Sequence, residues 1–420
     1  MAGRIMSGRG TPPPGLTGLA LTAGGARGAY QAGVLKRIGE LPALRGGSSP
    51  FRIVAGASAG AINGAAVAGY SDDLHRGTAR LAELWRDLTA DRVYRAGPLA
   101  MLGNGRRLLA DIALGRLLGA GRVQAMLDAA PLRQMLAREL PLDGIGRAVR
   151  RGDLYALAVT ATGYHSGKSY SFIQGRSGHP LWHKSRRIAL RADITVDHVC
   201  ASASIPLVFP PVALDTGGVR GWFGDGAMRL TTPLSPAIRL GAERLLAIGI
   251  RCRDTARQLT DRELSGDGDD AAAALPRRPP LSQICGVFLN AIFLDHLDAD
   301  LDHLIRMNEL VSAYTRGAGH GPETPDVSEP MRVIEPLVIS PSEDFAELAG
   351  DMVGRMPASV RFLLDILGEP DPRSADLTSY LLFDPAYTRA LIDIGYRDAD
   401  DRRDEIEAFL RGAGETAAAG

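Results

Sequence analysis

The sequence predicts an α/β protein in which helices cover a central sheet. Two observations lead to this prediction. Short apolar segments with strand character alternate with helix-patterned segments over residues 16–250, an arrangement typical of layered α/β folds. The chain has 420 residues, of which 45% are hydrophobic and 23% charged, so it carries enough apolar material for a substantial core.

The expected elements follow one another along this region. Helix 29–41 has the clearest signal, because its apolar residues recur at helical spacing. Residues 96–150 interleave Leu, Met and Arg and predict a helical insertion. We expect strands at residues 18–22, 51–55, 154–162, 169–172, 219–223 and 245–250, and helices at residues 29–41, 59–70, 72–88 and 195–203.

The chain divides by composition into four parts. We expect a disordered tail at residues 1–15, a first domain at residues 16–253, a linker at residues 254–280 and a mostly helical region at residues 281–420. The linker prediction depends on the Gly-, Asp-, Ala- and Pro-rich composition of that stretch. One apolar strand is expected within the last part, at residues 333–340.

Charge and cysteine content exclude several classes of protein. Lys and Arg total 48 and so do Asp and Glu, which argues against a dedicated nucleic-acid binder, although residues 92–151 hold eleven Arg against four acidic residues. Three cysteines without a CxxC pair indicate reduced thiols. We see no secretory signal and no apolar run of the roughly 18 residues that a membrane span needs. We therefore expect a cytoplasmic protein.

A glycine-rich turn stands between the first strand and the first helix. Gly24, Gly25 and Gly28 surround Ala26 and Arg27 there. Glycines free backbone N–H groups to point outward, and a helix start adds partial positive charge. The stretch predicts an anion-binding turn, for a phosphate or for an oxyanion that forms during a reaction.

A second glycine-bounded motif, GASAG, follows the second strand and opens a helix. Ser58 is its central residue, between Gly56 and Gly60. A sharp strand-to-helix turn of this kind lifts a serine hydroxyl clear of the sheet, and small neighbours are needed because the turn crowds the backbone. Ser58 is therefore a candidate nucleophile.

A nucleophilic serine needs a base. His296 and His303 lie on a charged helical segment, where a solvated face is the simpler interpretation. A metal site formed by these histidines with Asp298, Asp300 and Asp302 is a weaker alternative, because alternate helical positions diverge. Asp225 stands between Gly224 and Gly226 after an apolar strand, where it is either an ordinary Asp-Gly turn or a base held close to a hydroxyl.

The three stretches, in this order, resemble the patatin-like phospholipase family. Residues 24–28 are similar to its oxyanion block, residues 56–60 to its serine block and residues 225–227 to its Asp-Gly-Ala block; residues 201–211 match a segment common in bacterial members. Ala23 stands where the family often has a third glycine. The resemblance implies a three-layer α/β/α core with a mostly parallel sheet over residues 16–253, a helical insertion at residues 96–150 and a helical C-terminal extension.

The resemblance also implies a mechanism and a substrate. Ser58 would attack a lipid ester carbonyl, and Asp225 would accept its proton directly. The turn formed by Gly24, Gly25, Ala26, Arg27 and Gly28 would bind the oxyanion, with Arg27 orienting the turn or attracting anionic headgroups, and Gly56 and Gly60 would shape the elbow. Water would resolve the acyl-enzyme, and this chemistry needs no metal or organic cofactor.

The same motifs allow several other interpretations. A His-dependent carboxylesterase normally has several strands before its serine, and only 57 residues precede Ser58. An inactive lipid-binding or scaffold protein stays open as a different class. Ala26 and Ala29 break a dinucleotide-binding pattern, and residues 163–169 imitate a P-loop but are one residue short, so we expect a hairpin turn there. The Arg-rich residues 96–150 either meet an anionic lipid surface or form a solvated helical cap.

Overall fold

The structure, a computed structural model, describes residues 12–95, 125, 127–252, 284, 296–317, 331–358, 360–361 and 376–418. The tail prediction for residues 1–11, the insertion prediction for residues 96–124 and the linker prediction for residues 254–280 lie outside these residues. The strands are β1 (Thr17–Leu21), β2 (Ile53–Ala57), β3 (Ala156–Gly163), β4 (Lys168–Gly175), β5 (Arg187–Arg191), β6 (Val212–Thr216), β7 (Val219–Gly224), β8 (Arg244–Ile248) and β9 (Glu335–Ile339).

All nine of these described strands belong to one sheet. Its main path runs β5-β4-β3-β2-β1-β8-β9, and β7 joins β3 at one end and pairs with β6 in a hairpin. The five strands from β3 to β9 along this path pair in parallel. Only β4 with β3, β7 with β3 and β6 with β7 pair antiparallel. The predicted mostly parallel sheet is confirmed.

The described helices and turns have the following bounds. The α-helices are α1 (Gly28–Gly39), α2 (Ala59–Gly69), α3 (Leu74–Arg86), α4 (Ala90–Val93), α6 (Ala130–Glu139), α7 (Leu142–Arg151), α8 (Val196–Ser202), α9 (Ser235–Leu240), α12 (His296–Gly317), α13 (Phe345–Asp351), α15 (Asp376–Leu381), α16 (Pro385–Asp401) and α17 (Arg403–Ala418). The 3-10 helices are η1 (Gly25–Arg27), η2 (Pro42–Leu44), η3 (Gly226–Met228) and η4 (Val353–Arg355).

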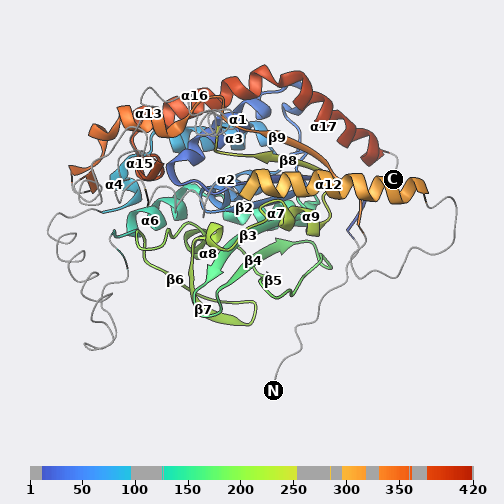
Figure 1. The fold of residues 1–420 in the computed structure, drawn as a ribbon, viewed down its shortest axis with the longest axis horizontal. Helices are drawn as coiled ribbons and strands as arrows, with labels where there is room; N and C mark the ends of the chain where they lie inside the picture. Colours follow the sequence, from blue (N-terminus) through green and yellow to red (C-terminus); the bar gives the residue numbers. More distant parts are fainter. Residues whose placement is uncertain are drawn as a thin grey trace, which may run out of the picture.

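Alternate residues of the central strands enter two different cores, because successive side chains of a strand point to opposite faces. On β1, Leu19 and Leu21 pack with α1, α2, α3, α7 and α16, whereas Ala20 packs with α9 and α12. On β2, Val54 belongs to the first of these two cores and Ile53 to the second. Helices thus cover both faces of the sheet, and the predicted three-layer α/β/α fold is confirmed (Figure 1).

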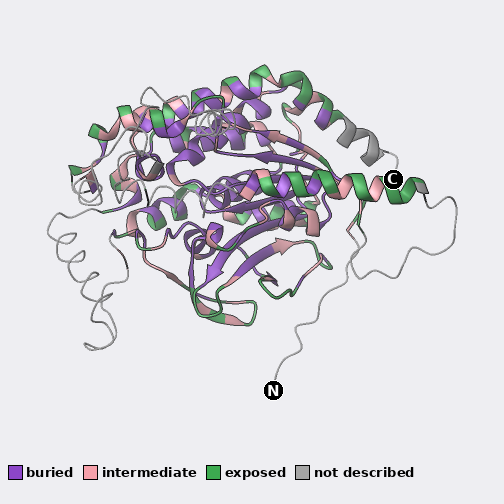
Figure 2. Ribbon diagram, viewed as in Figure 1, coloured by how far each residue is buried: buried purple, intermediate pink, exposed green. Residues whose placement is uncertain are grey.

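The C-terminal elements share the core of the earlier ones. Strand β9 pairs in parallel with β8, so residues 335–339 extend the same sheet. Helix α16 packs against α1, and its Leu391 and Ile392 join the core cluster of Val34 and Leu35. Figure 2 shows the central strands and α1 mostly buried, with exposed residues on α12, α16 and α17 and also at the β6–β7 hairpin.

Two strands had no clear signal in the sequence. Strand β5 has Arg at both ends and only three buried residues, and β6 has a single buried residue, Leu214. Neither segment shows the apolar run of a central strand. The predicted hairpin at residues 163–169 is confirmed, since β3 and β4 pair antiparallel around it. Cys200 and Cys252 are free and buried, and Cys285 lies outside the described residues.

Candidate active site

Ser58 lies on the sharp turn between β2 and α2. It has φ 54° and ψ −126°, a conformation that a residue with a side chain rarely adopts and that stores strain. The turn is tight because a Cβ on Gly60 would collide with the carbonyl oxygen of Leu21, and a Cβ on Gly56 would collide with that of Gly60. The two glycines therefore let α2 start directly against β1, with Ser58 at the N-cap of the helix.

The structure brings Ser58 and Asp225 into direct contact. The Ser58 hydroxyl donates a hydrogen bond of 2.6 Å to Oδ2 of Asp225, across 167 residues of sequence. Asp225 follows the end of β7 and is fully buried, and its Oδ1 accepts a hydrogen bond of 2.9 Å from the amide of Ala227. An O–H···O distance this short is typical of a hydrogen bond to an ionised carboxylate.

Burial changes the acidity of Asp225. Removal from water raises the pKa of its carboxyl from 3.8 to about 7, because desolvation disfavours the charged form. The hydrogen bonds from Ser58 and Ala227 act in the opposite direction and are smaller effects. A carboxylate with a pKa near neutrality is a stronger base than an exposed one, and it is still ionised in a large fraction of molecules at pH 7.

Residues from the segment 201–206 hold Ser58 and Asp225 in place. The amide of Ser58 donates to the hydroxyl of Ser202 at 2.9 Å, and that hydroxyl donates to the carbonyl of Thr160 at 2.6 Å. The amide of Asp225 donates to the carbonyl of Ser204 at 2.9 Å. The sequence predicted the resemblance of this segment to bacterial family members but no role for its residues. Its signal was two serines among small residues at the end of a short helix.

The glycine turn lies beside Ser58. Gly25 lines the same pocket as Ser58 and has φ 54°, whereas Gly24 has an extended φ. Neither of their amides donates a backbone hydrogen bond to another described residue. Ala26 and Arg27 are buried, and Gly28 packs so closely on Ala59 that a Cβ there would meet the Ala59 side chain at 2.6 Å. The turn and the serine elbow are therefore in direct contact.

A mostly apolar pocket opens at Ser58 and Gly25. Its space, including the part open to solvent, is about 480 Å³, and most of its wall is aliphatic or aromatic. Four parts of the chain that are far apart in the sequence build its apolar wall: the α2–α4 region, helix α6, the segment at residues 203–209 and Phe383, which follows α15. The apolar wall residues are Ile62, Leu84, Trp85, Leu88, Val93, Leu132, Met135, Ile205, Phe209 and Phe383.

A buried polar chain fixes the indole ring in this wall. The indole N–H of Trp85 donates to Oδ1 of Asn63 at 2.7 Å. The amide nitrogen of Asn63 donates to the carbonyl of Gly28 at 3.0 Å and to Oε1 of Gln31 at 2.9 Å. Gln31 in turn donates to the backbone carbonyl of Thr22 at 2.9 Å. The network joins the pocket wall to the start of α1, and no local pattern in the sequence predicted it.

No described histidine forms a hydrogen bond with Ser58 or Asp225. His296 lines a second cavity of about 540 Å³ at the carboxyl ends of the parallel strands, which borders the site at Ala57 and Ala227. His303 is exposed on α12. Within the described ranges, no group of three or more His, Cys, Asp or Glu side chains could hold a metal ion, and this includes the acidic face of α12.

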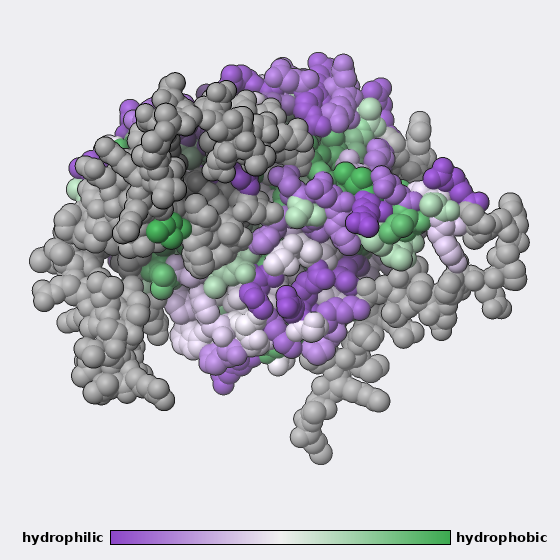
Figure 3. Space-filling view, in the orientation of Figure 1, coloured by the Kyte–Doolittle hydropathy of each residue, from purple (hydrophilic) through white to green (hydrophobic). Residues whose placement is uncertain are grey.

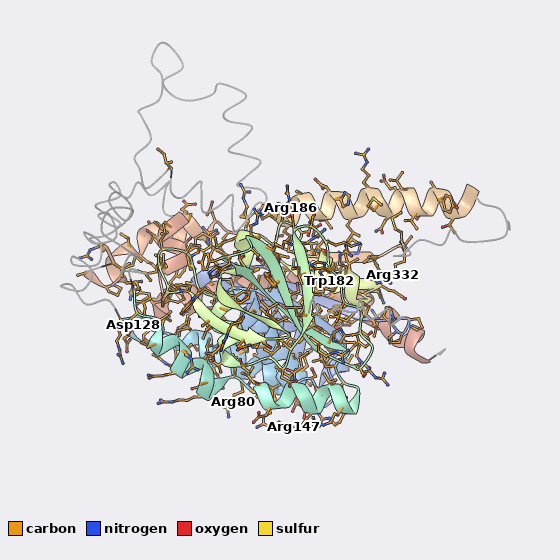
Figure 4. The ribbon with its side chains drawn as sticks, turned by 90° about the horizontal axis from the view of Figure 1, so that it is seen from below. Arg80, Asp128, Arg147, Trp182, Arg186 and Arg332 are labelled. Atoms are coloured by element: carbon orange, nitrogen blue, oxygen red, sulfur yellow. The ribbon has the colours of Figure 1, made fainter. Side chains whose placement is uncertain are left out.

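The described part of the Arg-rich region has two helices with exposed arginines. On α6, Leu132 and Met135 face the pocket, while Arg133 and Arg138 are exposed and Arg133 pairs with Asp197 at 2.7 Å. On α7, Arg147 points away from the sheet, as does Arg80 of α3 (Figure 4). The α6 helix therefore covers the pocket with its apolar face and presents its basic face to solvent.

With this geometry established, comparison with known proteins identifies the family. The sequence model of the patatin-like phospholipases matches residues 19–238, which is more than half of the chain. The chain belongs to the patatin-like phospholipase family. The match contains both the serine elbow and Asp225, and it ends within α9 of this patatin-like chain. No curated protein matches the chain.

Solved structures similar to this patatin-like chain share little sequence with it. VipD from Legionella pneumophila is 12% identical, with 91% of this chain and 67% of that chain covered and a TM-score of 0.29. The human GIVD cytosolic phospholipase A2 is 14% identical, with 95% and 60% covered and a TM-score of 0.39. The type III effector ExoU, known from Pseudomonas aeruginosa, is 13% identical, with 88% and 78% covered and a TM-score of 0.27. The chain thus spans about 60% of the length of the human protein.

The surface of the patatin-like chain is mixed. On the face shown in Figure 3, hydrophilic residues make up most of the described surface, and hydrophobic residues form several small groups. Among the described helices, none is long and apolar enough to cross a bilayer.

Proposed function

We propose that this chain is a serine lipid acyl hydrolase of the phospholipase A or esterase type. The contact between Asp225 and Ser58, which lines an apolar pocket, is the observation that carries the proposal. Membership of the patatin-like phospholipase family supports the same conclusion. The pocket is suited to an acyl chain, because its wall is mostly apolar and Ser58 supplies the one hydroxyl among its described lining residues.

In the proposed first step, Asp225 accepts the proton of Ser58 as the serine oxygen attacks the ester carbonyl. The hydrogen bond of 2.6 Å already aligns donor and acceptor. The tetrahedral intermediate places negative charge on the former carbonyl oxygen. We assign the amides of Gly24 and Gly25 to that oxygen, with Ala26, Arg27 and Gly28 completing the turn. This supplies donors that are oriented before the reaction begins.

In the proposed second step, Asp225 returns its proton to the leaving alcohol, and an acyl-enzyme remains on Ser58. A water molecule then gives a proton to Asp225 and attacks the acyl carbonyl. Collapse of this intermediate releases the carboxylic acid, and Asp225 returns its proton to the departing serine oxygen. Ser58 also occupies the N-cap position of α2, so the helix dipole favours negative charge near its oxygen.

The proposal also includes contact with the surface of a lipid aggregate. The exposed Arg138 of α6 and Arg147 and Arg150 of α7 support this part. Opposite charge attracts them to anionic lipids. Cosedimentation with vesicles of phosphatidylglycerol, compared with phosphatidylcholine vesicles, tests it; equal binding to both would contradict the role of these arginines.

The decisive experiment compares the wild-type protein with Ser58→Ala and Asp225→Asn. Hydrolysis of p-nitrophenyl esters and of phosphatidylcholine vesicles is measured, together with labelling by a fluorophosphonate and mass analysis of the labelled peptide. We expect label on Ser58 in the wild type, no turnover in Ser58→Ala and a loss of at least about 10³-fold in Asp225→Asn. A folded wild-type protein that neither turns over esters nor takes the label would instead be a lipid-binding scaffold.

A further inference from the structure

Arg27 of the glycine turn is buried, and its described partners come from the other end of the chain. Its Nε donates a hydrogen bond of 2.7 Å to the hydroxyl of Ser379, which lies 352 residues further along the sequence. The guanidinium carbon lies 4.7 Å from the centroid of the Tyr380 ring. Arg27 is only 3% exposed, so these contacts replace water around a charge that would otherwise be costly to bury.

Ser379 and Tyr380 belong to α15, and the backbone of this helix contacts the turn at a second point. A Cβ on Gly25 would collide with the carbonyl oxygen of Tyr380, and the positive φ of Gly25 independently disfavours any side chain. Ser379 and Tyr380, two consecutive residues of α15, therefore contact two residues of the turn, Gly25 and Arg27. The turn lies between α15 on one side and the serine elbow on the other.

The segment after α15 continues into the wall of the pocket. Phe383 lines the pocket together with Ser58, and its ring centroid is 6.1 Å from that of Tyr94. The Tyr94 hydroxyl donates to the carbonyl of Leu381 at 3.3 Å, so the segment is anchored to the α4 end of the pocket. Residues 379–383 thus touch the glycine turn at one end and the apolar wall at the other.

We propose that α15 is a positioning element of the active site. Ser379 and Tyr380 hold Arg27 and Gly25 so that the amides of the turn face the carbonyl oxygen of the ester that Ser58 attacks. This inference rests on the proposed hydrolase function. It gives residues 376–383 a part in catalysis, and it assigns Arg27 to the turn rather than to anionic headgroups, because a side chain 3% exposed does not reach a lipid surface.

The expected effect is on the chemical step. Removing one oxyanion donor costs other hydrolases about 10²–10³ in rate, and a displacement of about 1 Å can cost about 10². Loss of the Ser379 hydroxyl frees one of the contacts that hold Arg27. We expect kcat to fall by about 10- to 100-fold while KM stays within about twofold, because Ser379 does not line the pocket.

The test uses four variants of the full chain with p-nitrophenyl butyrate as substrate. Ser379→Ala and Arg27→Lys should both lower kcat, since lysine offers neither a planar group for Tyr380 nor a donor at the position of Nε. Ser379→Thr keeps the hydroxyl and should recover most of the activity. Thr378→Val is the matched control, because it removes a buried hydroxyl from the same helix but not the one bonded to Arg27.

Three readouts separate positioning from folding. Circular dichroism melting identifies a temperature at which each variant is folded, and fluorophosphonate titration counts intact sites. The rate of labelling should fall with kcat in Ser379→Ala and Arg27→Lys. The proposal is overturned if folded Ser379→Ala and Arg27→Lys keep at least half of the wild-type kcat, or if Thr378→Val loses as much as Ser379→Ala. The hydrolase function is tested separately, because it fails if the wild type does not hydrolyse the ester or if Ser58→Ala retains activity in the same assay.

Discussion

The hydroxyl of Ser202 stands between the amide of Ser58 and the carbonyl of Thr160, accepting a hydrogen bond of 2.9 Å from the first and donating one of 2.6 Å to the second. Both backbone groups belong to buried residues. The same side chain therefore satisfies two polar groups and fixes the elbow on which Ser58 is held at positive φ.

Replacing Ser202 by Ala should affect both stability and turnover. A buried amide without a partner costs about 1–3 kcal/mol, and we expect the free energy of unfolding to fall by about that amount. A looser elbow should lower kcat by about tenfold. Urea denaturation and steady-state kinetics measure the two effects. Ser204→Ala is the control, since its hydroxyl donates to Cys200 within α8, and an equal loss of kcat in both variants would contradict this role for Ser202.

The activity should depend on pH through Asp225. Burial raises the pKa of this carboxyl to about 7, and only its ionised form can accept the proton of Ser58. We therefore expect kcat/KM to rise with pH, with an inflection near 7 and a plateau above about pH 8. A pH profile with p-nitrophenyl butyrate between about pH 5 and pH 9 tests this. An inflection near 4 would show that the carboxyl titrates as an exposed one.

The same carboxyl should make the folded protein less stable as pH rises. The folded pKa, about 7, lies above the ordinary value of 3.8, so between these limits the folded state binds more protons than the unfolded state. This contribution to stability is present below about pH 4 and is lost as pH rises to about 7. Asparagine does not titrate, so Asp225→Asn lacks this loss. Its melting temperature relative to that of the wild type should therefore be higher at pH 8 than at pH 5. Melting curves at the two pH values check it, and an unchanged difference between the two proteins would contradict it.

Trp85 should limit the length of the acyl chain that the pocket accepts. Its indole lines the pocket and is held by Asn63. Trp85→Ala should raise the ratio of kcat/KM for a dodecanoyl ester to that for a butanoyl ester by about tenfold, because one or two methylenes are worth about 1–3 kcal/mol in an apolar pocket. Trp222→Ala is the control, since Trp222 is 44% exposed and does not line the pocket. If the ratio of kcat/KM for the two esters in Trp85→Ala were the same as in the wild type, Trp85 would not determine chain-length selectivity.

His296 should be dispensable. Its ring lines the second cavity, and the two carboxylate oxygens of Asp225 already accept hydrogen bonds from Ser58 and Ala227. We expect His296→Ala to keep kcat/KM within about twofold of the wild type. Ester hydrolysis measures it beside Ser58→Ala. If His296→Ala were as inactive as Ser58→Ala, a His-dependent mechanism would replace the Ser–Asp proposal.

Much of the fold could be predicted because its signals are local. Apolar runs predicted β1, β2 and β3, and helical spacing predicted α1. The edge strand β5 and the hairpin strand β6 escaped prediction, since each buries few residues and shows no apolar run. The strand expected at residues 333–340 is present as β9, but its parallel pairing with β8 follows only from the packing of the sheet.

The sequence by itself determined the strand–turn–helix setting of Ser58, the glycine content of the turn at residues 24–28 and the glycines around Asp225. These depend on backbone preferences that act over a few residues. Only the tertiary structure decided that the Asp225 carboxylate meets the Ser58 hydroxyl, that Ser202 supports the elbow and that Ser379 bonds to Arg27. Those contacts join residues 144 to 352 positions apart, and such distances are closed by the burial of shared apolar faces, which no local pattern encodes.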